Sequence, residues 1–290
     1  MTEQLPPPTR RFYDGGPVDG APDPTSPPLI VLERTPQMSP REFRMGRRIA
    51  YLDRELGELL VPADPATFTS DLASVPSVFA WLVPRIGRHL PAALLHDGLV
   101  GSTPQSRSYI STEGIEVDFE EANRVFRDAM ADTGTGVVRR RLMWTAVTLT
   151  MMVTGDSRWS GVERWRWRVT AIGTLAVLVV LGLWSTADLV DVLGGVPWMG
   201  EGSFWSRLLT GAAGAVTIPL VIAQVWGRFR VAGMIAGTAL ALLLHVTLAV
   251  AALTAIYRAT EWLARRAPWT AVVLGAGIVV SAGVVFIRSL

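Results

Sequence analysis

The chain contains no cysteine and no lysine, and each absence narrows what it can do. Without cysteine it can form no disulfide, no thiolate nucleophile and no zinc–thiolate site. Any chemistry must therefore use histidine, carboxylate, hydroxyl or metal groups. All 27 basic residues are arginine. This bias is typical of a GC-rich genome, and it also supplies planar guanidinium groups that suit phosphate.

The amino terminus lacks the features of a secretion signal. Residues 1–8 contain no basic stretch followed by an apolar one, so the sequence predicts no cleavable signal peptide and membrane insertion from an internal segment. Residues 1–28 hold eight prolines and three glycines, a composition that cannot bury a core. We therefore expect a disordered, proline-rich tail over residues 1–28.

Charge is missing from four long stretches in the second half of the chain. Each is 19 residues or longer, and about 20 apolar residues suffice to cross a bilayer as a helix. The sequence thus predicts four transmembrane helices within residues 169–290, at 169–187, 208–226, 231–257 and 269–287. An arginine- and tryptophan-rich juxtamembrane linker, residues 156–168, precedes them.

The arginines that flank these spans are unevenly distributed. Seven lie on the side that holds the linker, and four lie on the other side, namely Arg207, Arg258, Arg265 and Arg266. Basic residues near span ends concentrate on the cytoplasmic side of a membrane. We therefore expect a multi-pass protein of an inner or plasma membrane with both termini in the cytoplasm.

Two features inside the spans bear on assembly and transport. Glycine-rich helix faces, such as Gly233 to Gly237, let helices approach closely and are compatible with a homo-oligomer. His245 is the only ionisable side chain well inside a span, where it can bond a neighbouring helix or relay protons. The spans offer no carboxylate or arginine to continue a relay, which favours the hydrogen bond.

The segment before the linker, residues 29–155, predicts a small soluble α+β domain. Apolar stretches interrupted by Gly and Pro at 29–32, 43–52 and 59–68 indicate two or three strands. Four helices are expected, over residues 76–83, 91–100, 118–132 and 137–153. The third has a capping box that begins at Asp118 and an apolar stripe that we expect to pack on the second. The fourth is too short for a span and is predicted to be a core or interfacial helix.

A histidine–aspartate pair, His96 and Asp97, is the one place that is equipped for chemistry, together with residues 70–76 (SDLASVP). A buried polar pair bonded to the Asp71 loop would specify the fold. The same groups also suit a general base beside a calcium-binding carboxylate, or a binding module without turnover. Asp71 alternatively closes a turn or caps a helix. His89 follows Arg88 and is expected on the surface.

Residues 61–153 resemble the domain-of-unknown-function family 1353, which is frequent in phage and prophage genomes. The resemblance rests on VP at 61–62, FTSDLASVP at 68–76, AALLHDGL at 92–99, ANRVF at 122–126 with AM at 129–130, and RLMWTAV at 141–147. It implies a fold and a site more than an activity, and it leaves the four spans outside.

A second resemblance is to the His-Asp helix pair of secreted phospholipase A2. It implies that His96 deprotonates a water, that Asp97 and Asp71 hold calcium, and that an aspartate on the next helix orients the imidazole. This sequence has Asn123 at that place, and an amide orients an imidazole without stabilising its protonated form. The aromatic residue usual soon after the pair is Val100 here. The resemblance thus implies a lipid-ester hydrolase with a changed orienting group.

The remaining expectations concern partners and overall function. Arg139, Arg140 and Arg141 are expected to meet acidic headgroups of the lipid bilayer, and no basic stripe interleaved with aromatics indicates nucleic acid. The sequence predicts an α+β domain followed by a four-helix transmembrane bundle, in a membrane-anchored protein whose His-Asp pair is structural or ligand-binding. The alternatives are a calcium-assisted phospholipase A2-like hydrolase of membrane lipids and a phage-type lysis or scaffold protein.

Overall fold

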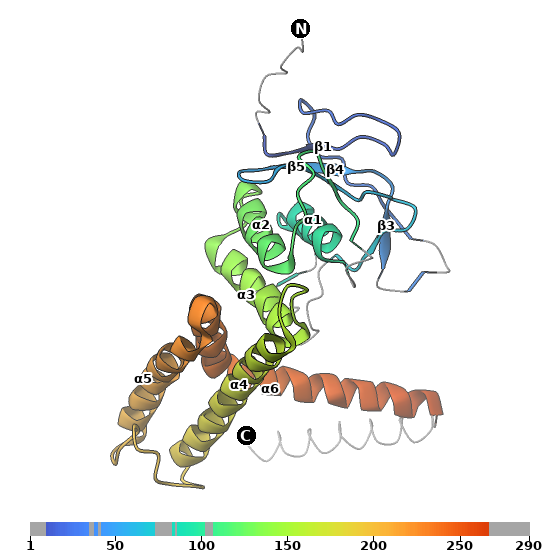
Figure 1. Ribbon diagram of the computed structural model, residues 1–290. Coiled ribbons are helices and arrows are strands. Elements are labelled where there is room, and N and C mark those ends of the chain that lie inside the picture. The colour runs from blue at the N-terminus through green and yellow to red at the C-terminus, as the bar shows by residue number, and fades with distance from the viewer. Residues whose placement is uncertain are drawn as a thin grey trace. The chain divides into compact units, whose positions relative to one another are not determined.

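The computed structural model describes residues 10–34, 38–39, 42–72, 83–84, 86–101 and 107–266 (Figure 1). The chain divides into two compact units, residues 1–242 and 243–290. The described part of the second unit is the carboxyl-terminal portion of one long helix, α6. All the sheets and the remaining helices belong to the first unit.

The strands form two antiparallel sheets. One sheet has the order β1-β4-β5-β7, with bounds Phe12–Asp14, Ile49–Asp53, Gly57–Val61 and Ile110–Ser111. The other has the order β2-β3-β6, with bounds Leu32–Glu33, Phe43–Met45 and Thr69–Ser70. The turn between β4 and β5 is closed by Asp53, whose Oδ1 accepts from the amides of Glu55 and Leu56 at 2.9 and 3.1 Å. The three predicted apolar stretches overlap β2, β3, β4 and β5, whereas β1, β6 and β7 lie outside them. The described residues thus form seven short strands where the sequence predicted two or three.

The first strand corrects the expectation of a disordered tail over residues 1–28. Phe12–Asp14 pairs with β4, and Tyr13 is buried against Ala50 and Leu60 on the face of the sheet opposite the main core. Arg47 forms an ion pair with Asp14 and fixes the strand further. Two aromatic side chains thus order a proline-rich segment by burial. Residues 1–9 lie outside the described residues.

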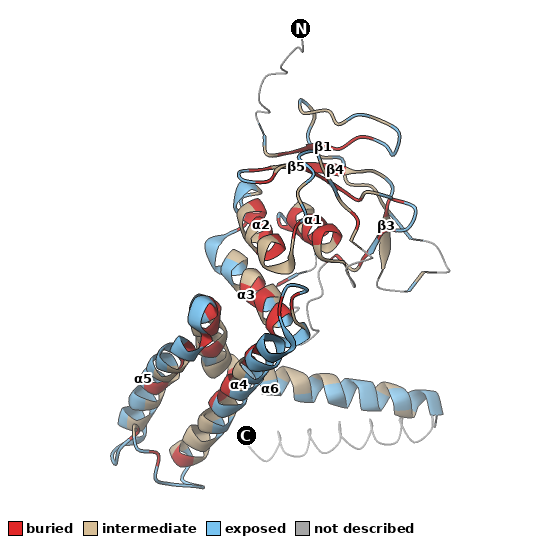
Figure 2. Cartoon of the chain, viewed as in Figure 1, coloured by how far each residue is buried: buried red, intermediate tan, exposed pale blue. Residues whose placement is uncertain are grey.

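Three helices pack with the four-stranded sheet to form the main core (Figures 1 and 2). They are α1 (Leu90–Val100), α2 (Phe119–Asp132) and α3 (Val137–Thr154). As predicted, Asp118 caps α2 by accepting from the Glu121 amide at 2.6 Å, and α2 packs on α1. A Cβ at Gly98 would lie 2.3 Å from Val61 Cγ1, so α1 approaches β5 at a distance that only glycine permits.

Two sequence predictions near α1 have different outcomes. His89, expected on the surface, is fully buried at the start of α1. The reason is that α1 lies between the sheet and α2, so its amino-terminal turn is covered as well as its apolar face. The helix predicted over residues 76–83 lies almost wholly outside the described residues.

The rest of the described chain is helical. The elements are α4 (Gly161–Leu189), α5 (Phe204–Ile222), the 3₁₀ segment η3 (Ala223–Phe229) and α6 (Arg230–Arg266). Within the described part, two segments are long and apolar enough to cross a membrane, Gly161–Leu189 and Phe204–Arg266. The structure thus supports two candidate apolar segments, where the sequence predicts a four-helix bundle. The span predicted at 269–287 lies outside the described residues.

The second candidate segment is interrupted where the sequence predicts a break between two spans. Gly227, inside η3, has φ 54° and ψ −117°, which is not helical and which favours glycine. One residue earlier, Trp226 is fully buried and its Nε1 donates to Thr174 Oγ1 of α4 at 3.2 Å. At the other end of α4, Arg207 of α5 donates to the carbonyl of Asp188 at 2.9 Å. Helices α4 and α5 therefore form a hairpin.

Candidate functional site

The predicted site residues His96 and Asn123 meet at the centre of the α1–α2 interface. The distance from His96 Nε2 to Asn123 Oδ1 is 2.8 Å, and both residues are buried. His96 lies in the middle of α1, and Asn123 lies one turn after the α2 cap, on the stripe that faces α1. The structure therefore brings together two residues that are 27 positions apart in the sequence.

The surroundings of His96 keep its ring neutral. Its ring centroid is 4.8 Å from that of Phe126 and 6.1 Å from that of Phe119. Burial among these groups lowers the pKa of His96 from 6.5 to about 4, and the bond to Asn123 offsets only part of this effect. In the assigned orientation the Asn123 oxygen accepts, so Nε2 donates and the remaining lone pair is on Nδ1.

Asp97 is joined to the neighbouring loop through a serine. Ser70 Oγ lies 2.5 Å from Asp97 Oδ2, to which it donates, and it accepts from the amide of Leu72 at 2.9 Å. Leu72 has φ 70°, an unusual conformation for a leucine. The pKa of Asp97 is raised to about 7, mainly by burial; the Ser70 bond opposes this shift and the charge of Asp71 adds to it. Residues 73–76 of this motif lie outside the described residues.

The calcium ligands implied by the second resemblance were Asp97 and Asp71. Calcium takes six to eight oxygen ligands. Across the described part of the chain, no group of three or more His, Cys, Asp or Glu side chains converges in a way that could hold a metal ion. The two aspartates interact electrostatically, but the remaining oxygens of such a site are not supplied by other side chains of these types.

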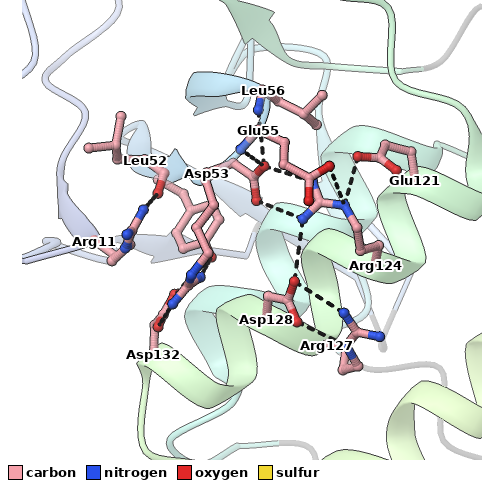
Figure 3. A network of polar contacts seen from close by, with 12 residues as sticks. Arg11, Leu52, Asp53, Glu55, Leu56, Glu121, Arg124, Arg127, Asp128 and Asp132 are labelled. Carbon is pink, nitrogen blue, oxygen red and sulfur yellow. Dashed lines mark hydrogen bonds and ion pairs between the residues drawn. The ribbon is translucent and has the colours of Figure 1, made fainter.

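A second polar network on α2 was not predicted (Figure 3). Arg124 donates to Asp53 at the β4–β5 turn at 2.7 Å and to Glu121 at 2.7 Å, and it contacts Asp128 at 3.3 Å. The side chain of Asp53 is fully buried. Sequence spacing gives the pairs of Arg124 with Glu121 and Asp128, which are three and four residues apart on a helix. It carries no signal for Asp53, which lies 71 residues away.

The amino-terminal turn of α2 is bound by residues close to the apolar helices. Asp118 pairs with Arg158 at 2.6 Å, and Glu120 pairs with Arg228 of η3 at 3.2 Å. The amide of Phe119 donates to the buried carboxylate of Asp156 at 3.0 Å. These contacts tie the helix that carries Asn123 to the segments before α4 and α6.

The fold and this site define an α+β domain with a buried histidine–asparagine contact, followed by apolar helices. Residues 47–147 match the model of the family described as "Protein of unknown function (DUF1353)", which supports the family that the motifs of this region predict. No curated protein and no solved structure matches the chain, and the phospholipase A2 resemblance gains no support. The matched region holds His96, Asn123, Asp53 and Arg124, whereas the apolar helices lie outside it.

Proposed function

We propose that this chain is a multi-pass membrane protein that holds its DUF1353 region at the cytoplasmic face of the bilayer. One observation carries the proposal. Each of the two candidate segments contains an apolar stretch long enough to cross a bilayer, and few residues of that stretch are buried inside the protein. Such a surface is costly in water and favourable in lipid. The proposal includes four spans, the fourth at 269–287, and both termini in the cytoplasm.

The proposed role of His96 and Asn123 is to join α1 to α2 with a polar contact that fixes how the two helices pack. A neutral imidazole with a pKa near 4 is a weak base at pH 7, because the best general bases have pKa values close to the working pH. Asn123 adds no charge that would stabilise an imidazolium. These properties support a structural or ligand-binding role more strongly than a catalytic one.

One observation favours the alternative of a calcium-assisted ester hydrolase. Because Nε2 of His96 is bonded to Asn123, the other ring nitrogen, Nδ1, carries the lone pair that would take a proton from water. Fatty-acid release from mixed phospholipid vesicles, with calcium or with a chelator, separates the two roles. The structural role predicts no release by the wild type. Calcium-dependent release that is lost in His96→Ala would establish the hydrolase. A phage-type lysis or scaffold role depends on the spans and tolerates that substitution.

The absence of cysteine makes the membrane arrangement directly testable. Two exposed positions receive single cysteines, Glu113→Cys in the turn after β7 and Glu201→Cys between α4 and α5. In intact spheroplasts, a membrane-impermeant maleimide should label Glu201→Cys at once and Glu113→Cys only after permeabilisation. The cysteine-free parent is the blank. Labelling with the opposite pattern would reverse the orientation, and release of both proteins by alkaline extraction would refute the anchor.

A further inference from the structure

Arginines surround α4 where its uncharged run begins. Arg164, Arg166 and Arg168 directly precede this run, which starts at Val169. Residues 164 and 168 share one face of the helix, and residue 166 lies on another. Arg230 is the first residue of α6 and lies near the amino-terminal part of α4. This position follows from the adjacent Phe229, whose ring centroid is 5.0 Å from that of Trp167 in α4. We call Arg164, Arg166, Arg168 and Arg230 the arginine collar.

Contacts within the protein hold three of the collar side chains in place. The Nε groups of Arg164 and Arg168 donate to the carbonyls of Trp159 and Val153, at 3.1 and 2.7 Å. Arg166 stacks over Trp167 with 4.6 Å from its guanidinium carbon to the ring centroid. Arg164 also donates from a terminal nitrogen to the carbonyl of Ser157, at 3.4 Å. The stacking of Arg166 and the Nε bond of Arg168 leave the terminal amino groups of these two side chains able to bind an anion.

Within the described residues the collar arginines form no ion pair, although Glu163 interacts electrostatically with Arg166 over a longer distance. Its neighbours Arg158 and Arg228 are paired with Asp118 and Glu120 on α2. In the part of the chain that the structure describes, no carboxylate lies within 4.0 Å of a collar guanidinium. Glu163, the nearest acid in sequence, instead closes the capping box of α4.

We propose that the arginine collar binds the phosphate groups of anionic lipids, an inference that rests on the membrane anchor proposed above. Planar guanidinium groups bind phosphate through paired hydrogen bonds. The exposed indole of Trp165, which lies between collar residues, suits the headgroup layer. A lipid is favoured over a free anion because the collar borders an apolar run that would place it at the depth of the headgroups.

The collar differs in position from the arginines that the sequence assigns to headgroups. Arg139, Arg140 and Arg141 lie in the first two turns of α3. At 1.5 Å per residue, Arg140 is about 21 Å along the helix from Thr154, at the end that leads to α4. These three arginines therefore provide a matched control of equal charge away from the expected bilayer edge.

The test uses the full chain, purified in neutral detergent micelles, and follows its melting temperature by tryptophan fluorescence. Phosphatidylglycerol, phosphatidylcholine or inorganic phosphate is titrated in. A ligand that binds only the folded state raises the melting temperature. We expect the largest rise with phosphatidylglycerol and a small or no rise with the other two. Arg166→Gln, Arg168→Gln and Arg230→Gln together should weaken the apparent affinity for phosphatidylglycerol by on the order of a hundredfold.

The controls make each outcome decisive. Arg139→Gln, Arg140→Gln and Arg141→Gln together should respond as the wild type does. A second variant carries lysine at the three collar positions, which keeps the charge and removes the guanidinium fork, so we expect an intermediate affinity. This variant provides the test if the glutamine variant does not fold. An unchanged response in both collar variants, or an equal rise with phosphatidylcholine or inorganic phosphate, would overturn the proposal. Retention in alkali-washed membranes separates this failure from failure of the anchor itself.

Discussion

The α+β domain and the apolar helices satisfy their polar side chains in different ways. In the domain, polar groups bind partners far away in the sequence, as Arg124 binds Asp53 and Tyr51 binds Asp132. In α4, α5 and α6, threonine hydroxyls repeatedly donate to the carbonyl four residues earlier, at Thr174, Thr186, Thr217, Thr254 and Thr260. Water can satisfy a polar group that lacks a partner in the protein, whereas in hydrocarbon the partner must come from the protein, and the helix's own carbonyls are the nearest acceptors.

This difference shows where specificity resides in the molecule. The domain's long-range polar contacts select one arrangement of helices and sheet, because each contact is lost if the packing changes. The threonine hydroxyls named above are satisfied within their own helix, and the exceptions in this region are the bonds of Trp226 to Thr174 and of Arg207 to Asp188, which join two elements. The domain should therefore be more sensitive to polar substitutions than the helices, which can be tested in the full chain in detergent micelles.

The largest effect is expected at Arg124. Arg124→Ala leaves the fully buried carboxylate of Asp53 with two amide donors and no cation. Removing one partner of a buried ion pair costs about 3 kcal/mol or more of unfolding free energy. Arg127→Ala is the control, because that side chain is more exposed and pairs only with Asp128, so a loss below about 1 kcal/mol is expected. Equal losses in denaturant unfolding would show that the network contributes no specific stability.

A second effect depends on pH and has opposite signs at His96 and Asp97. Between pH 4 and 6.5 the unfolded chain binds a proton on His96 that the folded chain does not, so this residue makes stability rise with pH, by about 3 kcal/mol in all. Between pH 4 and 7 the folded chain retains a proton on Asp97 that the unfolded chain has released, so this residue makes stability fall. The two contributions oppose each other in the wild type.

Single substitutions should separate these contributions. In Asp97→Asn the unfolding free energy should rise with pH from 4 to 6.5 more steeply than in the wild type, because only the His96 contribution remains. In His96→Gln it should fall over the same range. Thermal unfolding at several pH values measures both, and differences from the wild type remove contributions shared by other carboxylates. Parallel curves for all three proteins would mean that neither residue is buried as described.

The contrast between local and distant contacts also explains what could be predicted from the sequence. The α2 cap at Asp118 and the packing of α2 on α1 follow from spacing within a dozen residues. The contact between His96 and Asn123 was suggested by family motifs. The pairing of Phe12 with β4 and the Asp53–Arg124 bond were not predicted. Each joins residues that are far apart in the sequence, and no local pattern indicates which distant residues will meet. Burial of His89 was missed for the same reason.

The smallest effect is expected in the apolar helices. Thr217→Val in α5 removes a hydroxyl whose only bond here is to the carbonyl of Ala213, at 2.9 Å, and that carbonyl also accepts within the helix. Valine keeps the shape, so unfolding free energy should change by less than about 0.5 kcal/mol. Thr174→Val is the matched comparison, because its hydroxyl also accepts from Trp226. It should cost about 1 kcal/mol by leaving that buried indole N–H without its acceptor. A larger loss at Thr217 than at Thr174 would mean that α5 has a polar partner outside the chain, and the comparison between the two regions would then fail.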